Sequence, residues 1–230
     1  MSVVVEPGTI DWVLATTRAV RRRLDLERAV DVEVVLDCLD LALQAPTGGD
    51  AQGWRWIVIT RPSTKARIRD IYVDALTAAS GGPPPGPSTS SGSSANRMLD
   101  DAWHLATHLD RVPVLVVACV RGRLTPERTL AQAAALLGSI YPAVWSLQLA
   151  LRSRGLASVM TTVHLQRHED MAELLGIPDG VTQAALVPIA HLLGDELHPA
   201  RRRPARQVAF PDHWHGVWDP PIGPPAGAAG

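Results

Sequence analysis

The chain contains little cysteine and almost no lysine. Cysteine occurs only at Cys38 and Cys119, both in apolar stretches and without the spacing of a zinc site or a redox pair. This pattern predicts no metal site and favours a reducing, cytoplasmic environment. Of the 22 basic residues, Lys65 is the sole lysine, so arginine supplies nearly all of the positive charge. The bias has two explanations, genomic composition or a need for planar guanidinium groups that bind anions.

Neither sign of charge is in excess. The 230 residues carry a formal net charge of −1, which argues against a surface that binds nucleic acid or anionic membrane throughout. Hydrophobic residues make up 46% of the chain, an ordinary fraction for a folded soluble domain. We therefore expect neither a nucleic-acid partner nor general disorder.

The chain also lacks a segment that would insert into a membrane. The most apolar stretch, residues 130–151, has helical periodicity and is interrupted by polar side chains. Glu6 and Asp11 interrupt the N-terminal segment, which therefore does not read as a secretory signal sequence. These features predict no membrane association.

Hydrophobic periodicity and turn residues predict helices that alternate with strands. Helices are expected over residues 9–23, 31–45, 62–79, 96–109, 126–154 and 167–175. Strands are expected over residues 55–60, 112–120, 156–163 and 182–193. We interpret residues 1–230 as one domain that contains both helices and four or five strands.

Two segments lack the apolar residues that a packed element needs. Residues 81–95 consist mainly of glycine, proline and serine, and are predicted to form a flexible loop. Residues 196–230 are rich in proline and arginine, with isolated aromatic side chains. Such a C-terminal arm cannot form a core alone, so we expect it to lie on another surface, such as that of a second subunit.

The familiar catalytic and nucleotide-binding motifs are absent. No glycine-rich fingerprint follows a predicted strand, and the chain has neither a phosphate-binding P-loop nor a serine nucleophile elbow. Two histidine pairs, His104/His108 and His164/His168, have the four-residue spacing of one helix face. Neither pair has a third ligand at a recognised spacing, so we interpret these histidines as exposed to solvent.

Arginine gathers at both ends of the chain. One cluster lies within residues 18–23 and the other within residues 201–206. Guanidinium groups from both clusters would bind one phosphate if the fold brought them together. Two separate solvated basic patches explain the same pattern, and the charge pattern alone favours that explanation.

The segment from Ala45 to Trp54 joins a predicted helix to a predicted strand. It combines small residues with side chains that form hydrogen bonds, namely Thr47, Asp50 and Gln52. A flat ligand is able to approach such a backbone closely. A tight, capped turn is the competing explanation.

Four segments resemble motifs of the nitroreductase family, in the family's order. Thr17-Arg-Ala-Val-Arg21 is similar to its Arg-Arg-Ser-x-Arg phosphate motif, and residues 45–54 are similar to its Ala-Pro-Ser-x-x-Asn-x-Gln-Pro-Trp loop. Gly155-Leu-Ala-Ser-Val-Met-Thr-Thr162 resembles the Gly-Leu-Gly-Ser segment and the strand that touches the flavin. Arg201-Arg-Arg-Pro204 resembles the C-terminal basic motif, and Leu174-Leu-Gly-Ile-Pro178 is also typical.

The resemblance implies an α+β fold, in which helices flank a mixed, mainly antiparallel sheet and a C-terminal arm reaches the partner subunit. It further implies a homodimer with FMN at the interface, reduced by NAD(P)H and oxidised by a small aromatic acceptor such as a nitro compound or a quinone. The cofactor would carry the reaction, so no catalytic side chain is required. Alternatives on the same fold are reductive dehalogenation, oxygen-dependent flavin breakdown, or flavin binding without turnover.

The family's cofactor-binding positions transfer to this chain motif by motif. The first and last motifs would bind the FMN phosphate, the loop would line the flavin from the other subunit, and the third motif would meet the pyrimidine edge of the ring. The positions implied are Arg18, Ala19, Arg21, Pro46, Thr47, Gly48, Met160, Thr161, Thr162 and Arg202.

Three positions depart from the family pattern. Ala19 stands where serine is usual and removes a hydroxyl donor, and Thr17 replaces the first arginine. Asp50 replaces the usual asparagine, and a carboxylate near the ring would oppose an anionic reduced flavin. These departures predict weaker FMN binding or a lower reduction potential.

Overall fold

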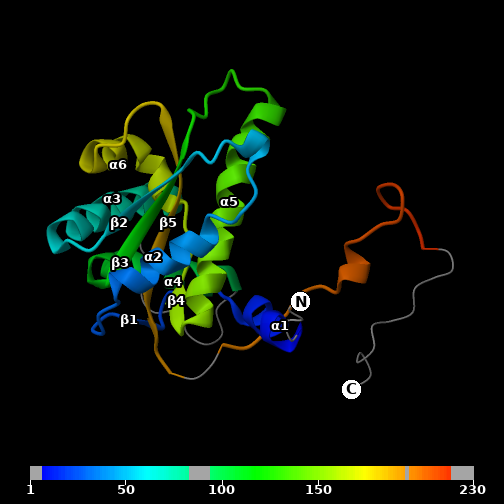
Figure 1. Ribbon diagram of the computed structural model, residues 1–230. Coiled ribbons are helices and arrows are strands. Elements are labelled where there is room, and N and C mark those ends of the chain that lie inside the picture. The colour runs from blue at the N-terminus through cyan, green and yellow to red at the C-terminus, as the bar shows by residue number, and fades with distance from the viewer. Residues whose placement is uncertain (1–6, 83–93, 195–196, 219–230) are drawn as a thin grey trace, which may run out of the picture. The chain divides into compact units, whose positions relative to one another are not determined.

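The computed structural model describes residues 7–82, 94–194 and 197–218 (Figure 1). It divides the chain into two units, residues 1–197 and His198–Gly230, which are considered separately. Residues 83–93 of the expected loop, and residues 196 and 219–230 of the expected arm, lie outside the described part. Ser94 already begins a helix, and Gly81 ends the preceding helix with the left-handed φ of 76° that glycine tolerates.

A five-stranded sheet forms the centre of the first unit. All of its strand pairs are antiparallel, in the order β1-β5-β3-β2, and β4 also pairs with β5. This arrangement, with six helices among the described residues, confirms the expected α+β fold with a mainly antiparallel sheet. The strands are β1 (Leu24–Asp25), β2 (Trp54–Ile59), β3 (Val114–Arg121), β4 (Leu156–Ser158) and β5 (Val181–Leu192).

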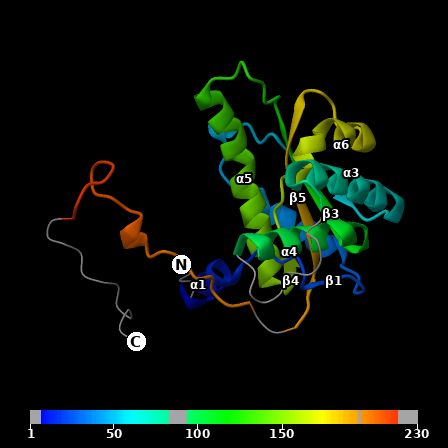
Figure 2. The same ribbon diagram turned by 180° about the vertical axis from the view of Figure 1, so that it is seen from behind.

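Helices cover both faces of the sheet (Figures 1 and 2). Side chains of α2 and α5 form a first core on one face, and those of α3, α4 and α6 form a second core on the other. The helices are α1 (Pro7–Thr16), α2 (Val32–Ala42), α3 (Pro62–Ser80), α4 (Ser94–His108), α5 (Leu130–Ser153) and α6 (His168–Leu175).

The central strand β3 is buried on both faces, which explains its unbroken apolar sequence. Alternate side chains point to opposite faces of a strand, so Val116 and Ala118 enter the first core while Leu115 and Val117 enter the second. A strand buried on both faces has no position for a polar residue. The strand expected over residues 112–120 is therefore confirmed.

The largest differences from the expected helix boundaries are at the end of α1 and at the start of α5. The helix expected over residues 9–23 ends at Thr16, because Val20 donates its backbone N–H to the Ser158 carbonyl (3.1 Å) instead of continuing the helix. The helix expected from residue 126 begins at Leu130, where Thr129 and Gln132 form a reciprocal capping box.

Two expectations about strands also need correction. The strand expected over residues 156–163 ends at Ser158, and only Thr161 pairs again with β5, through an isolated bridge to Leu186. The two-residue strand β1 was not expected, because two residues are too short for a periodic pattern.

Among the described residues, α5 is the one helix with the length and apolar composition of a membrane span. Its buried side, which includes Ile140, Val144, Leu147 and Leu151, packs into the first core. A core helix satisfies the same length and composition test.

Candidate functional site

The fold brings the first and third sequence motifs together. Ala19 and Ser158 form a parallel bridge, and the Val20 N–H donates to the Ser158 carbonyl. Arg18 and Arg21 are half-buried on this segment, and Ala19 is exposed. A segment that carries two guanidinium groups therefore runs beside the strand end that the third motif predicts to touch a flavin.

Thr161 is held on three sides. Its backbone N–H donates to the Leu186 carbonyl and its carbonyl accepts from the Leu186 N–H, both at 2.9 Å. Its hydroxyl lies 2.8 Å from the hydroxyl of Tyr72, which is only 1% exposed. Met160 and Thr162, on either side, are exposed. The family resemblance implies that residues 160–162 contact the flavin ring. Met160 and Thr162 are accessible to such a ligand, whereas Thr161 is buried.

Arg21 belongs to the same group of residues electrostatically. Burial raises the pKa of the Tyr72 hydroxyl, the hydrogen bond with Thr161 lowers it, and the positive charge of Arg21 lowers it further. The net pKa is above the ordinary value, so Tyr72 stays protonated and neutral at physiological pH. Arg21 thus lies close enough to act on the pair formed by Tyr72 and Thr161.

We call the region where residues 18–21 lie beside residues 158–162 the corner. The C-terminal half of α5 packs against it. Gln148 Nε2 donates to Ser158 Oγ (3.2 Å), and Arg152 Nε donates to Thr16 Oγ1 (3.3 Å). Arg152 is 7% exposed, and its Nη2 has no hydrogen-bond partner among the described residues. Arg152 therefore adds a buried positive charge next to α1, whose end leads into the first motif.

Two members of the first arginine cluster have structural roles. Arg22 Nε forms an ion pair with Asp101 Oδ1 (2.5 Å), and Arg23 Nε donates to the Leu193 carbonyl (2.8 Å). The cluster, which was expected to end a helix, lies instead on the irregular segment between α1 and β1. One departure from the family motif, Thr17, also has a local role, because Thr17 Oγ1 donates to the Val13 carbonyl at 2.7 Å.

The loop after α2 packs against the N-terminal half of α5. The Gly48 N–H donates to Ser139 Oγ (3.4 Å), and Trp54 Nε1 donates to the Ser139 carbonyl (2.7 Å). Asp50 and Gln52 have positive φ angles of 52° and 43°, which side-chain-bearing residues rarely adopt. Their side chains bond to each other at 2.7 Å, so Asp50 serves the loop itself.

Within one chain, the loop and the corner stay apart. Ser139, which holds the loop, and Arg152, which holds the corner, are thirteen residues apart on α5, or about 20 Å at the helical rise. The structure therefore does not bring Pro46, Thr47 and Gly48 to Arg18 and Arg21 of the same chain. Arg202, the remaining predicted position, is exposed in the second unit, where its Nη1 donates to the Arg201 carbonyl (3.3 Å).

The expectation that all four paired histidines are exposed holds for His168 and is wrong for His164, and His104 and His108 are half-buried. His164 is completely buried, its ring nitrogens have no hydrogen-bond partner in the described part of the chain, and burial lowers its pKa to about 4. His164 and His168 do not share one helix face, because His164 lies in the 3-10 helix Val163–Arg167 and His168 begins α6. Among the described residues, no group of three or more potential ligands forms a metal site.

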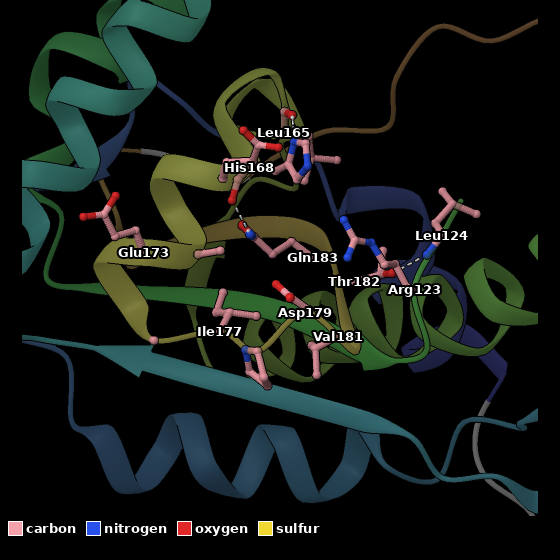
Figure 3. Close-up of a pocket in the computed structure, with 14 residues that line it drawn as sticks. Arg123, Leu124, Leu165, His168, Glu173, Ile177, Asp179, Val181, Thr182 and Gln183 are labelled. Carbon is pink, nitrogen blue, oxygen red and sulfur yellow. Dashed lines mark hydrogen bonds between the residues drawn. The ribbon is translucent and has the colours of Figure 1, made fainter. Parts of the chain in front are cut away.

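A separate cavity of about 730 Å³ lies between α6, the start of β5 and the segment after β3 (Figure 3). Arg123, His168, Asp179 and Gln183 surround the same space, whereas Glu173 points away from it (Figure 3). Gln183 Nε2 donates to the His168 carbonyl at 2.8 Å, and its Oε1 has no partner. None of the ten predicted cofactor positions lines this cavity.

Sequence reasoning missed Tyr72, Gln148 and Arg152, which hold the corner together. All three lie on helices that were predicted, and the periodic pattern marks such positions only as buried or exposed. No local motif distinguishes them, because their partners are 10 to 136 residues away along the chain.

The sequence pattern of the nitroreductase family matches residues 14–191. Among solved structures, the chain is similar to oxidized iodotyrosine deiodinase bound to FMN and 3-iodo-L-tyrosine, at 20% identity and a TM-score of 0.64, covering 84% of this chain and 94% of that chain. It is also similar to a nitroreductase with bound FMN from Desulfitobacterium hafniense, at 18% identity and a TM-score of 0.63, covering 90% and 99%.

A third similar structure is an FMN- and NADPH-dependent nitroreductase from sphigopyxis sp. strain HMH, with 18% identity, a TM-score of 0.65 and coverage of 90% and 99%. At these identities the similarity establishes a shared fold. No curated protein sequence matches the chain.

Proposed function

Because the chain belongs to the nitroreductase family, we propose that it is a cytoplasmic FMN-dependent oxidoreductase. It passes electrons from NAD(P)H to a small aromatic acceptor such as a nitro compound or a quinone. The observation that carries the proposal is the pairing of residues 18–21 with Ser158, which places the phosphate motif beside the flavin motif.

The described residues fit such a cofactor. Arg18 and Arg21 supply positive charge for the phosphate, and the family resemblance assigns Arg202 of the C-terminal arm to the same phosphate. The buried positive charge of Arg152 lies beside Thr16, the last residue of the helix that leads into the phosphate motif. Met160 and Thr162 are exposed beside the firmly held Thr161, as residues that contact a ring must be.

The protein's part in the reaction is to bind, orient and stabilise. When bound, FMN supplies the hydride and electron chemistry, so the absence of an acid–base triad from the sequence agrees with the proposal. Hydrogen-bond donors near the pyrimidine edge favour the charge that reduction adds there. The lack of a hydroxyl at Ala19 leaves phosphate binding to the guanidinium groups and the backbone.

We further propose that the protein is a homodimer, which would place Pro46, Thr47 and Gly48 of one subunit at the other subunit's corner. Support comes from large apolar side chains that α2, the loop after it and α5 leave exposed. Their exposed fractions range from 37% to 49%, and water contact over such an area is unfavourable. They are Leu36, Leu41, Leu43 and Trp145.

The phosphate assignment is tested by FMN titration of a double variant, Arg21→Ala with Arg202→Ala. The control, Arg67→Ala with Arg206→Ala, likewise removes one guanidinium group from each unit, in this case from two exposed residues. The proposal expects the first variant to lose the flavin and the control to keep it. Full FMN occupancy in the first variant would overturn the assignment.

The reaction is tested by anaerobic reduction with NADH and with NADPH, followed by oxidation with nitroaromatic, quinone and halophenol acceptors. Bleaching of a yellow protein by either nicotinamide, with reoxidation by a nitroaromatic or a quinone, supports the proposed activity. Reoxidation by halophenols alone would instead assign a dehalogenase. A protein that stays colourless after reconstitution with FMN would contradict the proposal.

A further inference from the structure

We propose that Tyr72 is a positioning residue for the FMN site, whose hydroxyl sets the orientation of Thr161 and of the exposed residues beside it. The inference rests on the proposed function. It adds a residue from α3, which lies outside all four sequence motifs, to the machinery of the site.

Among the described residues, the hydrogen-bond partner of the Tyr72 hydroxyl is the hydroxyl of Thr161. The ring is packed in the second core, where the apolar part of the side chain alone satisfies the surroundings. The hydroxyl lies 2.8 Å from Thr161 Oγ1, and both side chains are more than nine-tenths buried. A buried hydroxyl is costly without a partner, so Tyr72 and Thr161 depend on each other.

Thr161 connects the buried Tyr72 hydroxyl to a segment whose neighbouring side chains are exposed. Its backbone is tied to Leu186 by two hydrogen bonds, and its Oγ1 also accepts a longer bond (3.4 Å) from the Val163 N–H. The side chains next to it in sequence, Met160 and Thr162, are exposed. The contact with Tyr72 therefore orients the Thr161 side chain within the short, irregular segment that presents these two residues.

Arg21 completes the argument for a role at the site. Its positive charge lowers the pKa of the Tyr72 hydroxyl, and the same hydroxyl contacts Thr161 of the flavin motif. A purely structural tyrosine would be tied to the core away from both motifs. Tyr141 is such a residue, because its hydroxyl donates to the Ala184 carbonyl (3.1 Å) on the face of the first core.

The chain contains only these two tyrosines, so each serves as the control for the other. Tyr72→Phe and Tyr141→Phe both remove one hydroxyl and keep the ring. We expect Tyr72→Phe to weaken binding of oxidised FMN about 3- to 10-fold, the range of one hydrogen bond, and to change the affinity for reduced FMN by a different factor. The unequal factors appear as a shifted midpoint potential, and the visible circular dichroism of the bound flavin changes with it.

Thr161→Val removes the same contact from the other side and serves as the second measurement if Tyr72→Phe fails to fold. The double variant should lose no more FMN affinity than the stronger single variant, because both changes break one interaction. Tyr141→Phe should leave the affinity and the midpoint potential unchanged. Potential and dichroism are read on loaded protein, so a lower folding stability alone does not move them.

The outcomes separate this inference from the proposed function. If the unaltered protein does not bind FMN, both fail. If it binds FMN and Tyr72→Phe matches it in affinity and potential, the positioning role is overturned while the proposed function stands. Additive losses in the double variant, or equal effects of Tyr72→Phe and Tyr141→Phe, would also overturn the positioning role.

Discussion

The guanidinium carbon of Arg152 lies 4.3 Å from the centre of the Trp12 indole ring. Arg152 comes from the last turn of α5 and Trp12 from α1, which Figure 1 shows beside the lower end of α5. The same guanidinium donates to Thr16, the last residue of α1. This pair therefore fixes the helix that leads directly into the phosphate motif.

Loss of the pair should release α1. Arg152→Met keeps much of the aliphatic side chain but removes the charge and its donors. We expect the free energy of unfolding to fall by about 1–2 kcal/mol and the amides of α1 to exchange faster with deuterium. Urea denaturation and hydrogen exchange measure the two effects. Arg154→Met, at a more exposed arginine two residues away, is the control, and equal behaviour of the two variants would contradict the prediction.

His164 should make the protein sensitive to acid. Its pKa falls from the ordinary 6.5 to about 4 in the folded state, because burial disfavours the charged ring. Between these values the unfolded chain binds a proton that the folded chain does not, so stability falls as the pH drops from about 6.5 to about 4 and does not change above that range. The loss should reach about 3 kcal/mol.

Denaturation curves between pH 4 and pH 7 test this dependence. His164→Phe should flatten the curve across that range, whereas His213→Gln, a change at an exposed histidine, should leave it as it is. A pH dependence that survives in His164→Phe would assign the acid sensitivity to other groups.

Lys65, the sole lysine, should be protected and structurally necessary. Its Nζ donates to the carbonyls of Val112 (2.7 Å) and Pro113 (3.3 Å), and burial lowers its pKa. Lys65→Met would leave buried carbonyl oxygens unpaired, at a cost of about 1–3 kcal/mol in the free energy of unfolding. Arg67→Met, on the exposed side of the same helix, should cost far less.

Chemical labelling gives an independent measurement of Lys65. An amine-reactive ester should leave the ε-amine unmodified in the folded protein and modify it after denaturation, as peptide mass spectrometry would detect. Rapid labelling of Lys65 in the folded state would show that the side chain is accessible and would refute the prediction.

The apolar face of α2 and α5 should be the dimer interface. Light scattering of the purified protein should give twice the chain mass of 24.7 kDa. Leu41→Glu with Trp145→Glu places two charges on this face, and should yield monomers with weakened FMN binding. Met98→Glu adds a charge at an exposed apolar position on α4, and should leave the dimer intact. A flavin-loaded monomer of the unaltered protein would contradict the homodimer.

Local signals in the sequence predicted several elements well. Asp31 is the first residue of the helix expected over residues 31–45, and it caps α2, because its side chain accepts from the Glu33 N–H. The apolar run of β3 indicated a strand buried on both sides, which the alternation of its side chains between the two cores confirms. These features depend on neighbours within a few residues or on burial alone, so the sequence contains the information directly.

Such local signals do not predict which residues far apart in the sequence pair with each other. The helical pattern continued past Thr16, but the chain leaves the helix because Val20 gains a backbone partner at Ser158. The expected proximity of residues 18–21 to the third motif came from the family resemblance, and the bridge between Ala19 and Ser158 brings these segments together. The burial of His164 had no local signal, since its periodic position suits either face.

The sequence alone indicated the family to which the chain belongs and the segments that carry its motifs. It explained the bias toward arginine only in part, because the charge pattern of the clusters at residues 18–23 and 201–206 by itself favours two solvated patches. The tertiary structure decided how the first cluster is used: Arg22 and Arg23 bind the fold itself, and the charge of Arg21 lowers the pKa of the Tyr72 hydroxyl. Such roles depend on distances between residues far apart in the chain, and only the folded backbone sets those distances.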